Sequence, residues 1–133
     1  MVSISQIAIA VEDIDKAKGV FETLIGKPAS QPHLVESQNV NVSFIEVGET
    51  KIELLEPAAP QTPITNFLEK RGGGIHHIGI KTNQFDEMIQ KLKSMGVRTL
   101  GDPTVGAEGH RVIFFHPKDT FGVLIELEEA SDE

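Results

Sequence analysis

Apolar and polar residues alternate along two segments that lie far apart in the chain, residues 4–11 and residues 75–82. Alternation with a period of two predicts a β-strand, because successive side chains of a strand point to opposite faces of a sheet. When the two segments are aligned, Gln6 falls on His77, an offset of 77 − 6 = 71 residues. The alignment indicates an internal repeat.

Each expected strand is followed by a segment whose apolar residues recur at spacings of three and four. The two sets are Ile14, Ala17, Phe21 and Leu24 in the first segment and Phe85, Met88, Leu92 and Met95 in the second. Such spacing places an apolar stripe along one side of an α-helix. Asp13 stands at the expected start of the first helix and Asn83 or Gln84 at that of the second. Gly26 and Gly96 follow where a helix is expected to end.

The repeat extends to the ends of the two halves. An alternating pattern around a central glutamate closes each half, and Glu53 falls on Glu126, an offset of 126 − 53 = 73 residues. Another run rich in β-branched and aromatic residues precedes each glutamate, at residues 40–45 and 111–115, across an expected hairpin turn. The pattern in each half therefore predicts a β–α–β–β–β arrangement.

Prolines and glycines separate the halves. Three prolines fall within residues 57–63, which predicts a linker, and residues 64–70 predict a short helix. We expect one domain over residues 1–133, with modules at about 3–57 and 74–129 and the linker and short helix at 58–73. A module of roughly 60 residues buries little core alone. The prediction is an α+β fold, with two tandem βαβββ modules forming curved mixed sheets around a metal-binding cleft. The alternative is a generic α+β domain whose halves match by accident.

Strand alternation indicates which side chains share a face. Gln6 shares a face with Ala8, and His77 shares one with Gly79. Small residues beside Gln6 and His77 are expected to leave space over that surface. A single histidine in a strand is more often a packed core residue than a ligand, so the repeat has to support the metal interpretation.

Glu53 and Glu126 each lie between two apolar residues. One such glutamate would more often lie on the outer face of a sheet, whereas two at repeat-related positions favour a shared polar cavity. A pseudo-twofold axis would bring them together with Gln6 and His77. One imidazole, two carboxylates and an amide oxygen suit Co²⁺, Zn²⁺, Ni²⁺ or Mn²⁺. Four ligands on an octahedral ion leave two positions for a substrate.

Composition removes several other classes of protein. The chain has no cysteine, which excludes disulfides and thiolate metal sites and fits a cytoplasmic protein. Its formal charge is −8, and without a basic patch we expect no nucleic-acid partner. No apolar run approaches the roughly 20 residues that span a bilayer, and the first residues lack signal-peptide features. An acidic chain can still bind an anion where a few local cations overcome the field.

The chain resembles the vicinal oxygen chelate superfamily and, within it, the methylmalonyl-CoA epimerases over nearly its whole length. The matching stretches are residues 7–13, 47–57, 73–79, 116–118 and 122–127. The resemblance implies a homodimeric isomerase with Co²⁺ or Zn²⁺, whose ligands fall on Glu53, His77 and Glu126. Gln6 departs from the histidine of that family, and forms of the related glyoxalase I carry glutamine at this place.

The implied reaction interconverts the R and S forms of methylmalonyl-CoA. The proton at C2 lies between two carbonyl groups, whose oxygens can chelate the ion while an enolate forms. Epimerisation needs a base on one face and an acid on the other. Glu53 and Glu126, from opposite halves, are the expected pair, each partly displaced from the metal.

Other interpretations remain open at this point. A lyase of the glyoxalase I type, acting on the hemithioacetal of glutathione, would use the same metal site, and Gln6 favours it. A non-catalytic small-molecule binding protein of the same fold is the third possibility. His116 and Lys118 can meet the carboxylate or the phosphates of an acyl-CoA, or can belong to a solvated turn. His76 faces away from His77 and is expected to be structural or at a dimer interface.

Overall fold

The computed structural model describes residues 1–106 and 109–131, which form two compact units. The N-terminal unit is Gln6–His76, and the C-terminal unit is His77–Glu133 together with Met1–Ser5. The elements are β1 (Val2–Ala10), α1 (Ile14–Ile25), β2 (His33–Val35), β3 (Val40–Val47), β4 (Thr50–Pro57), α2 (Thr65–Arg71), β5 (Gly74–Thr82), α3 (Phe85–Ser94), β6 (Thr104–Val105), β7 (Arg111–Phe115) and β8 (Leu124–Glu129). Across these residues no helix is both long and apolar enough to cross a bilayer.

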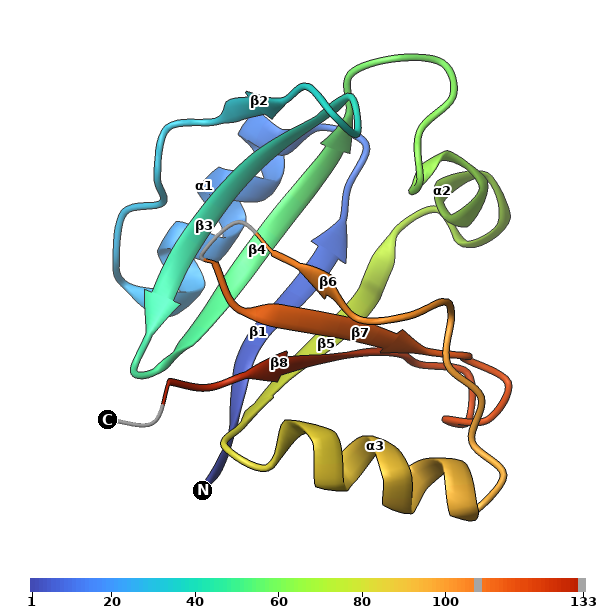
Figure 1. The fold of residues 1–133 in the computed structure, drawn as a ribbon. Helices are drawn as coiled ribbons and strands as arrows, with labels where there is room; N and C mark the ends of the chain where they lie inside the picture. The colour runs from blue at the N-terminus through green and yellow to red at the C-terminus, as the bar shows by residue number, and fades with distance from the viewer. Residues whose placement is uncertain (107–108, 132–133) are drawn as a thin grey trace. The chain divides into compact units, whose positions relative to one another are not determined.

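The strands of the N-terminal unit follow the order β2-β3-β4-β1 (Figure 1). Strands β3 and β4 form an antiparallel hairpin, β2 pairs with β3 antiparallel, and β1 pairs with β4 parallel. The parallel pair needs the long crossover through α1. The unit is therefore a mixed sheet of the βαβββ kind, as the sequence predicts.

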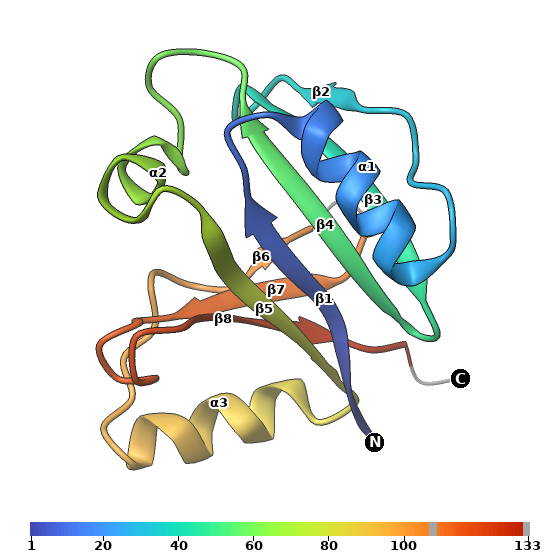
Figure 2. The same ribbon diagram turned by 180° about the vertical axis from the view of Figure 1, so that it is seen from behind.

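Helix α1 covers one face of this sheet, in front of β3 and β4 in Figure 2. Asp13 caps the helix by accepting a hydrogen bond from the Lys16 backbone N–H at 3.1 Å, and Gly26 ends it in the left-handed conformation. The Glu56 carboxylate also accepts the Ile14 N–H at 2.8 Å, which ties the start of α1 to β4. Capping from Asp13 and from Glu56 fixes where the helix begins.

The opposite face of the sheet carries the core that α2 covers. Its buried residues are Ala8, Ala10, Val40, Val42, Leu55, Ile64 and Leu68. Ala8 is fully buried in this cluster. The expectation that Ala8 leaves open space over its face is wrong, because side chains of the neighbouring strands and of α2 fill that volume.

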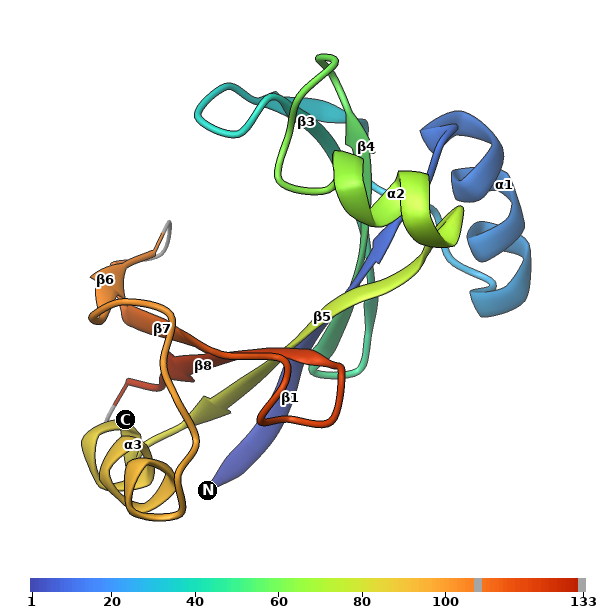
Figure 3. The same ribbon diagram turned by 90° about the vertical axis from the view of Figure 1, so that its right-hand side faces the viewer.

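The C-terminal unit repeats this plan in the order β5-β8-β7-β6. Strand β5 pairs with β8 parallel, and β7 pairs antiparallel with both β8 and β6. Helix α3 runs along one face (Figure 3), where Phe85, Ile89, Ile113, Phe115 and Leu127 form the core. Gln84 takes the N-cap position of α3 without a side-chain capping bond, and Asn83 instead accepts a hydrogen bond from the N-terminal amine.

Two sequence predictions fail in detail. Leu24 is 73% exposed and Met95 is 75% exposed, so neither belongs to an apolar stripe. Each lies in the last turn or just beyond its helix, where the chain turns away from the sheet.

Candidate active site

His77 and Glu126 lie on one face of the C-terminal unit. Strand β5 is in register with β8 such that Gly79 is opposite Glu126 and His77 is opposite Leu124. Partners in a ladder point to the same face, and residues two apart along a strand share it. The two side chains are therefore diagonal neighbours on adjacent strands. Helix α3 packs on the other face.

Gln6 and Glu53 stand in the same relation within the N-terminal unit. Ala8 is opposite Glu53 in the β1–β4 ladder, and Gln6 is opposite Lys51. Gln6 and Glu53 are again diagonal neighbours on adjacent parallel strands, on the face opposite α1. The ladders thus confirm the alignment of the repeat, strand by strand.

A phenylalanine accompanies each glutamate, which the sequence analysis missed. Phe44 of β3 is opposite Glu53, and Phe114 of β7 is opposite Glu126. The signal was present, because the runs at residues 40–45 and 111–115 align with an offset of 114 − 44 = 70 residues. Phe114 meets the His77 ring edge-on, with ring centroids 5.9 Å apart.

All four predicted ligands are partly exposed, as a site open to substrate requires. Gln6 and Glu53 belong to one unit, and His77 and Glu126 belong to the other. Over residues 1–106 and 109–131, no group of three or more His, Cys, Asp or Glu side chains is arranged to hold a metal ion. Each unit thus offers a pair of ligand-type residues, an amide with a carboxylate and an imidazole with a carboxylate.

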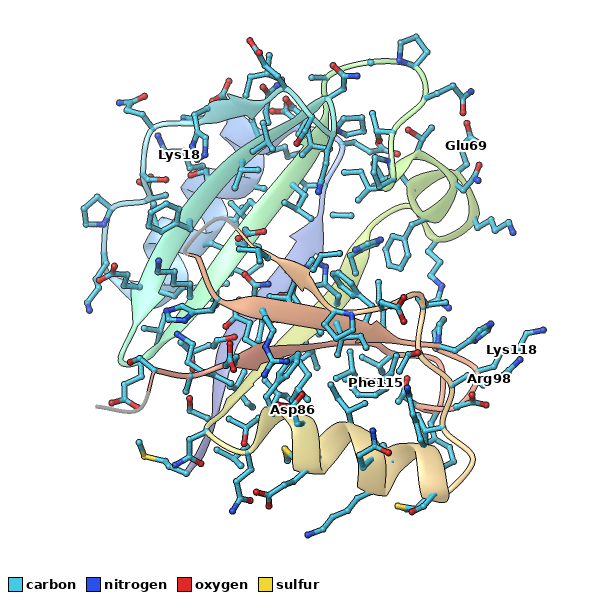
Figure 4. The ribbon with its side chains drawn as sticks, in the orientation of Figure 1. Lys18, Glu69, Asp86, Arg98, Phe115 and Lys118 are labelled. Carbon is cyan, nitrogen blue, oxygen red and sulfur yellow. The ribbon has the colours of Figure 1, made fainter. Side chains whose placement is uncertain are left out.

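His116 and Lys118 lie in the turn between β7 and β8. The His116 Nδ1 accepts a hydrogen bond from the Lys118 backbone N–H at 3.2 Å, and the His116 backbone N–H donates to the Arg98 carbonyl at 2.8 Å. Lys118 is exposed, and in Figure 4 it points away from the strands, as does Arg98. Hydrogen bonds of His116 therefore hold the start of the turn, and the ammonium group of Lys118 points outward.

An ion pair holds this turn in place. Asp119 accepts hydrogen bonds from the Arg98 Nε at 2.8 Å and from the Arg98 backbone N–H at 2.9 Å. The guanidinium of Arg98 lowers the pKa of Asp119 to about 2. No sequence pattern predicts this pair, because its members are 21 residues apart and belong to different loops.

His76 packs against α2 of its own unit. Its ring meets Phe67 of α2 edge-on at 5.2 Å, and burial lowers the pKa of the imidazole below its usual value. The cause is desolvation, because burial beside an apolar partner disfavours the charged form of the ring.

A polar hollow of about 430 Å³ lies at the start of α3, and none of the predicted site residues lines it. Asp86, His110 and Glu129 are among the residues that line it. Arg111 bridges Asp86 and Glu129 at 2.8 Å and lowers the pKa of both carboxyl groups. Because the charges of these two carboxylates are balanced by Arg111, the hollow is a poor candidate for a catalytic or metal-binding site.

Known proteins match the chain along nearly all of its length. Residues 5–114 match the family model of the Glyoxalase/Bleomycin resistance protein/Dioxygenase superfamily. The mitochondrial methylmalonyl-CoA epimerase of Mus musculus is 40% identical over 129 residues, 96% of this chain and 72% of the relative. The ethylmalonyl-CoA/methylmalonyl-CoA epimerase of Cereibacter sphaeroides is 40% identical over 130 residues, 96% of this chain and 97% of the relative.

Solved structures agree with the sequence relatives. A methylmalonyl-CoA epimerase in complex with methylmalonyl-CoA and NH₄⁺ has a TM-score of 0.83 and 31% identity, covering 99% of this chain and 96% of that one. The fold, the repeated ladders and these relatives lead to the same assignment. The chain belongs to the Glyoxalase/Bleomycin resistance protein/Dioxygenase superfamily and, within it, to the family of the methylmalonyl-CoA epimerases.

Proposed function

We propose that this chain interconverts the R and S forms of methylmalonyl-CoA by removing and returning the proton at C2. The observation that carries the proposal is the repeated ladder, which sets Gln6 beside Glu53 and His77 beside Glu126 on one face of each unit. Relatives that are 40% identical carry the name of this activity.

We propose Gln6, Glu53, His77 and Glu126 as the ligands of one divalent ion, with Co²⁺ or Zn²⁺ ahead of Ni²⁺ or Mn²⁺. The donor set fits such an ion, because imidazole nitrogen and carboxylate oxygen are common ligands for these metals. A bound ion supplies positive charge for the carbonyl oxygens, where negative charge develops as the C2 proton leaves. The amide oxygen of Gln6 is the weakest of the four donors.

Glu53 and Glu126 are the proposed acid and base. One carboxylate takes the C2 proton from one face of the substrate, and the other, protonated, returns a proton to the opposite face. After a turnover the two have exchanged protonation states, so the same pair can run the reverse reaction. The repeat supports this assignment, because it supplies two carboxylates in equivalent settings.

Proton exchange at C2 tests the activity directly. Methylmalonyl-CoA in D₂O is followed by NMR with Co²⁺-loaded protein and with protein treated with EDTA. We expect exchange and epimerisation only with the metal-loaded protein. Absence of both with that sample would overturn the proposed activity.

Glutamine replacements test the two carboxylates. Glu53→Gln and Glu126→Gln should each abolish epimerisation while the far-UV circular dichroism stays that of the folded protein. Each variant keeps one base, so it should still exchange the C2 proton of one stereoisomer without inverting it. Epimerisation retained in both variants would refute the two-base scheme.

Gln6 supports one competing function, a lyase of the glyoxalase I type that isomerises the hemithioacetal of glutathione and methylglyoxal. That reaction also moves a proton between carbons beside a metal ion. The same metal-loaded protein, incubated with glutathione and methylglyoxal, distinguishes the two. Thioester formation there, without exchange of methylmalonyl-CoA, would favour the lyase.

Three further assignments belong to this proposal. His116 and Lys118, on the turn fixed by Arg98 and Asp119, are proposed to contact the substrate carboxylate or the coenzyme A phosphates. The family resemblance supports a homodimer, which light scattering coupled to size-exclusion chromatography can test. The absence of cysteine supports action in the cytoplasm.

A further inference from the structure

Lys51 is a cation on the same face as two of the proposed ligands. It lies in β4, opposite Gln6 of β1, and two residues before Glu53 along its own strand. Both relations place Lys51 on the face opposite α1. Its side chain is partly buried, and its Nζ lies 4.9 Å from the centre of the Phe44 ring. The ammonium group is therefore held over the aromatic neighbour of Glu53.

The contact with Phe44 leaves the hydrogen-bonding capacity of Lys51 available. An ammonium group over a ring face is attracted by the ring quadrupole, which uses none of its three N–H donors in a conventional hydrogen bond. Lys51 takes no part in the ion pairs that join Arg98 to Asp119 and Arg111 to Asp86 and Glu129. In a chain of formal charge −8, such a cation suits an anionic ligand.

The repeat shows that this cation is not part of the shared scaffold. The position equivalent to Lys51 in the C-terminal unit is 51 + 73 = 124, which is Leu124, opposite His77 in its own ladder. Phe44 and Phe114 are equivalent, yet Phe114 contacts an imidazole while Phe44 contacts an ammonium. The fold is built without a lysine in one unit, so Lys51 is free to serve ligand recognition in the other.

We propose that Lys51 binds an anionic oxygen of the substrate beside Gln6 and Glu53, and that Phe44 is its positioning residue. This inference rests on the proposed function, which supplies an anionic substrate. The recognised group is a carboxylate or a phosphate, and an acyl-CoA of a malonic acid carries both. A strand lysine that is merely solvated would leave substrate affinity unchanged when its charge is removed.

Lys51→Gln tests the cation, with Lys18→Gln on α1 as the matched control. Both changes remove one positive charge from the same unit, and α1 covers the other face of the sheet (Figure 2). Calorimetry should show methylmalonyl-CoA binding about tenfold or more weaker in Lys51→Gln, the loss expected for one charge-assisted hydrogen bond. KM should rise in parallel, whereas kcat and Co²⁺ affinity should change little. Unchanged methylmalonyl-CoA affinity in Lys51→Gln would overturn the inference.

A second substrate separates the two anionic groups. The methylmalonyl thioester of N-acetylcysteamine keeps the carboxylate and lacks every phosphate. If Lys51→Gln raises KM equally for both thioesters, Lys51 binds the carboxylate. If only the coenzyme A thioester is affected, Lys51 binds a phosphate. A wild-type protein that binds methylmalonyl-CoA through Lys51 without epimerising it would refute the proposed function alone.

Phe44 is tested by replacement and rescue. Phe44→Leu keeps an apolar side chain and removes the ring, so KM should rise in the same direction as for Lys51→Gln, with kcat little changed. Phe44→Tyr keeps a ring face for the ammonium and should restore KM to near the wild-type value. Equal KM values in the leucine and tyrosine variants would remove Phe44 from the inference.

Discussion

The ring of Phe114 meets the imidazole of His77 edge-on, at 5.9 Å between centroids and 81° between planes. Phe114 is also opposite Glu126 across the β7–β8 ladder. One aromatic side chain thus stands beside both proposed ligands of the C-terminal unit. Because a metal ligand has to be held in one orientation, the contact suggests that Phe114 pre-orients the His77 ring.

Phe114→Leu should therefore weaken metal binding by up to about 10-fold, the lower end of the range for groups that orient a ligand. Co²⁺ titration followed by visible absorption measures this affinity. Phe44→Leu is the matched control, since it removes a ring beside the other glutamate that contacts no imidazole, and it should have little effect. Equal losses in the two variants would mean that the ring acts through packing alone.

Neighbouring histidines should behave differently towards metal. His77→Ala should lower Zn²⁺ or Co²⁺ affinity by more than about 100-fold, since even residues that only orient ligands contribute 10- to 100-fold. His76→Ala should leave that affinity unchanged, because His76 packs on Phe67. Competition with a chromophoric chelator measures both. A large loss in the His76 variant would contradict the assignment of the two faces.

Much of this arrangement could be predicted from the sequence. The aligned repeat correctly predicts the strand faces of Gln6, Glu53, His77 and Glu126. In a long strand the alternation of apolar and polar residues indicates which side chains share a face. Strands β2 and β6 were not located, since segments of three and two residues are too short to show a period. The Phe44–Lys51 and Arg98–Asp119 contacts were also missed. They depend on which residues face one another across strands or loops, and a single sequence does not display that.

Two glycines should respond in opposite ways to alanine. Gly73 has φ +130°, and a Cβ there would lie 3.1 Å from the Ala10 carbonyl oxygen, so Gly73→Ala should lower the free energy of unfolding by about 1–3 kcal/mol. Gly19 lies inside α1 with open space around it, and Gly19→Ala should raise stability by about 0.5–1 kcal/mol. Urea denaturation measures both changes. A Gly73 variant as stable as wild type would show that the turn relaxes without strain.

The Arg98–Asp119 pair should persist well into the acid range. Folding lowers the pKa of Asp119 from 3.8 to about 2. A lowered carboxyl pKa stabilises the folded state fully above the unfolded value, and the contribution is lost as the pH falls towards the folded value. The pair should therefore stabilise the fold above about pH 4 and stop contributing near pH 2. The Asp119 carboxyl ¹³C shift should titrate near 2, and in Arg98→Gln its midpoint should return towards 3.8. An unchanged midpoint in that variant would contradict the assigned cause.

The ladders also limit where the chain can gain or lose residues during evolution. Between the two halves the offset is 71 at Gln6, 70 at Phe44 and 73 at Glu53, so the halves differ in length between these aligned positions. A residue inserted in β4 ahead of Glu53 would turn Glu53 towards α1 and would turn Leu55 away from the core that α2 covers. Length variation among homologues should accordingly be confined to connections such as the β3–β4 and β7–β8 turns. Such turns can diverge in sequence and length while each residue of the paired strands stays on the same face of its sheet.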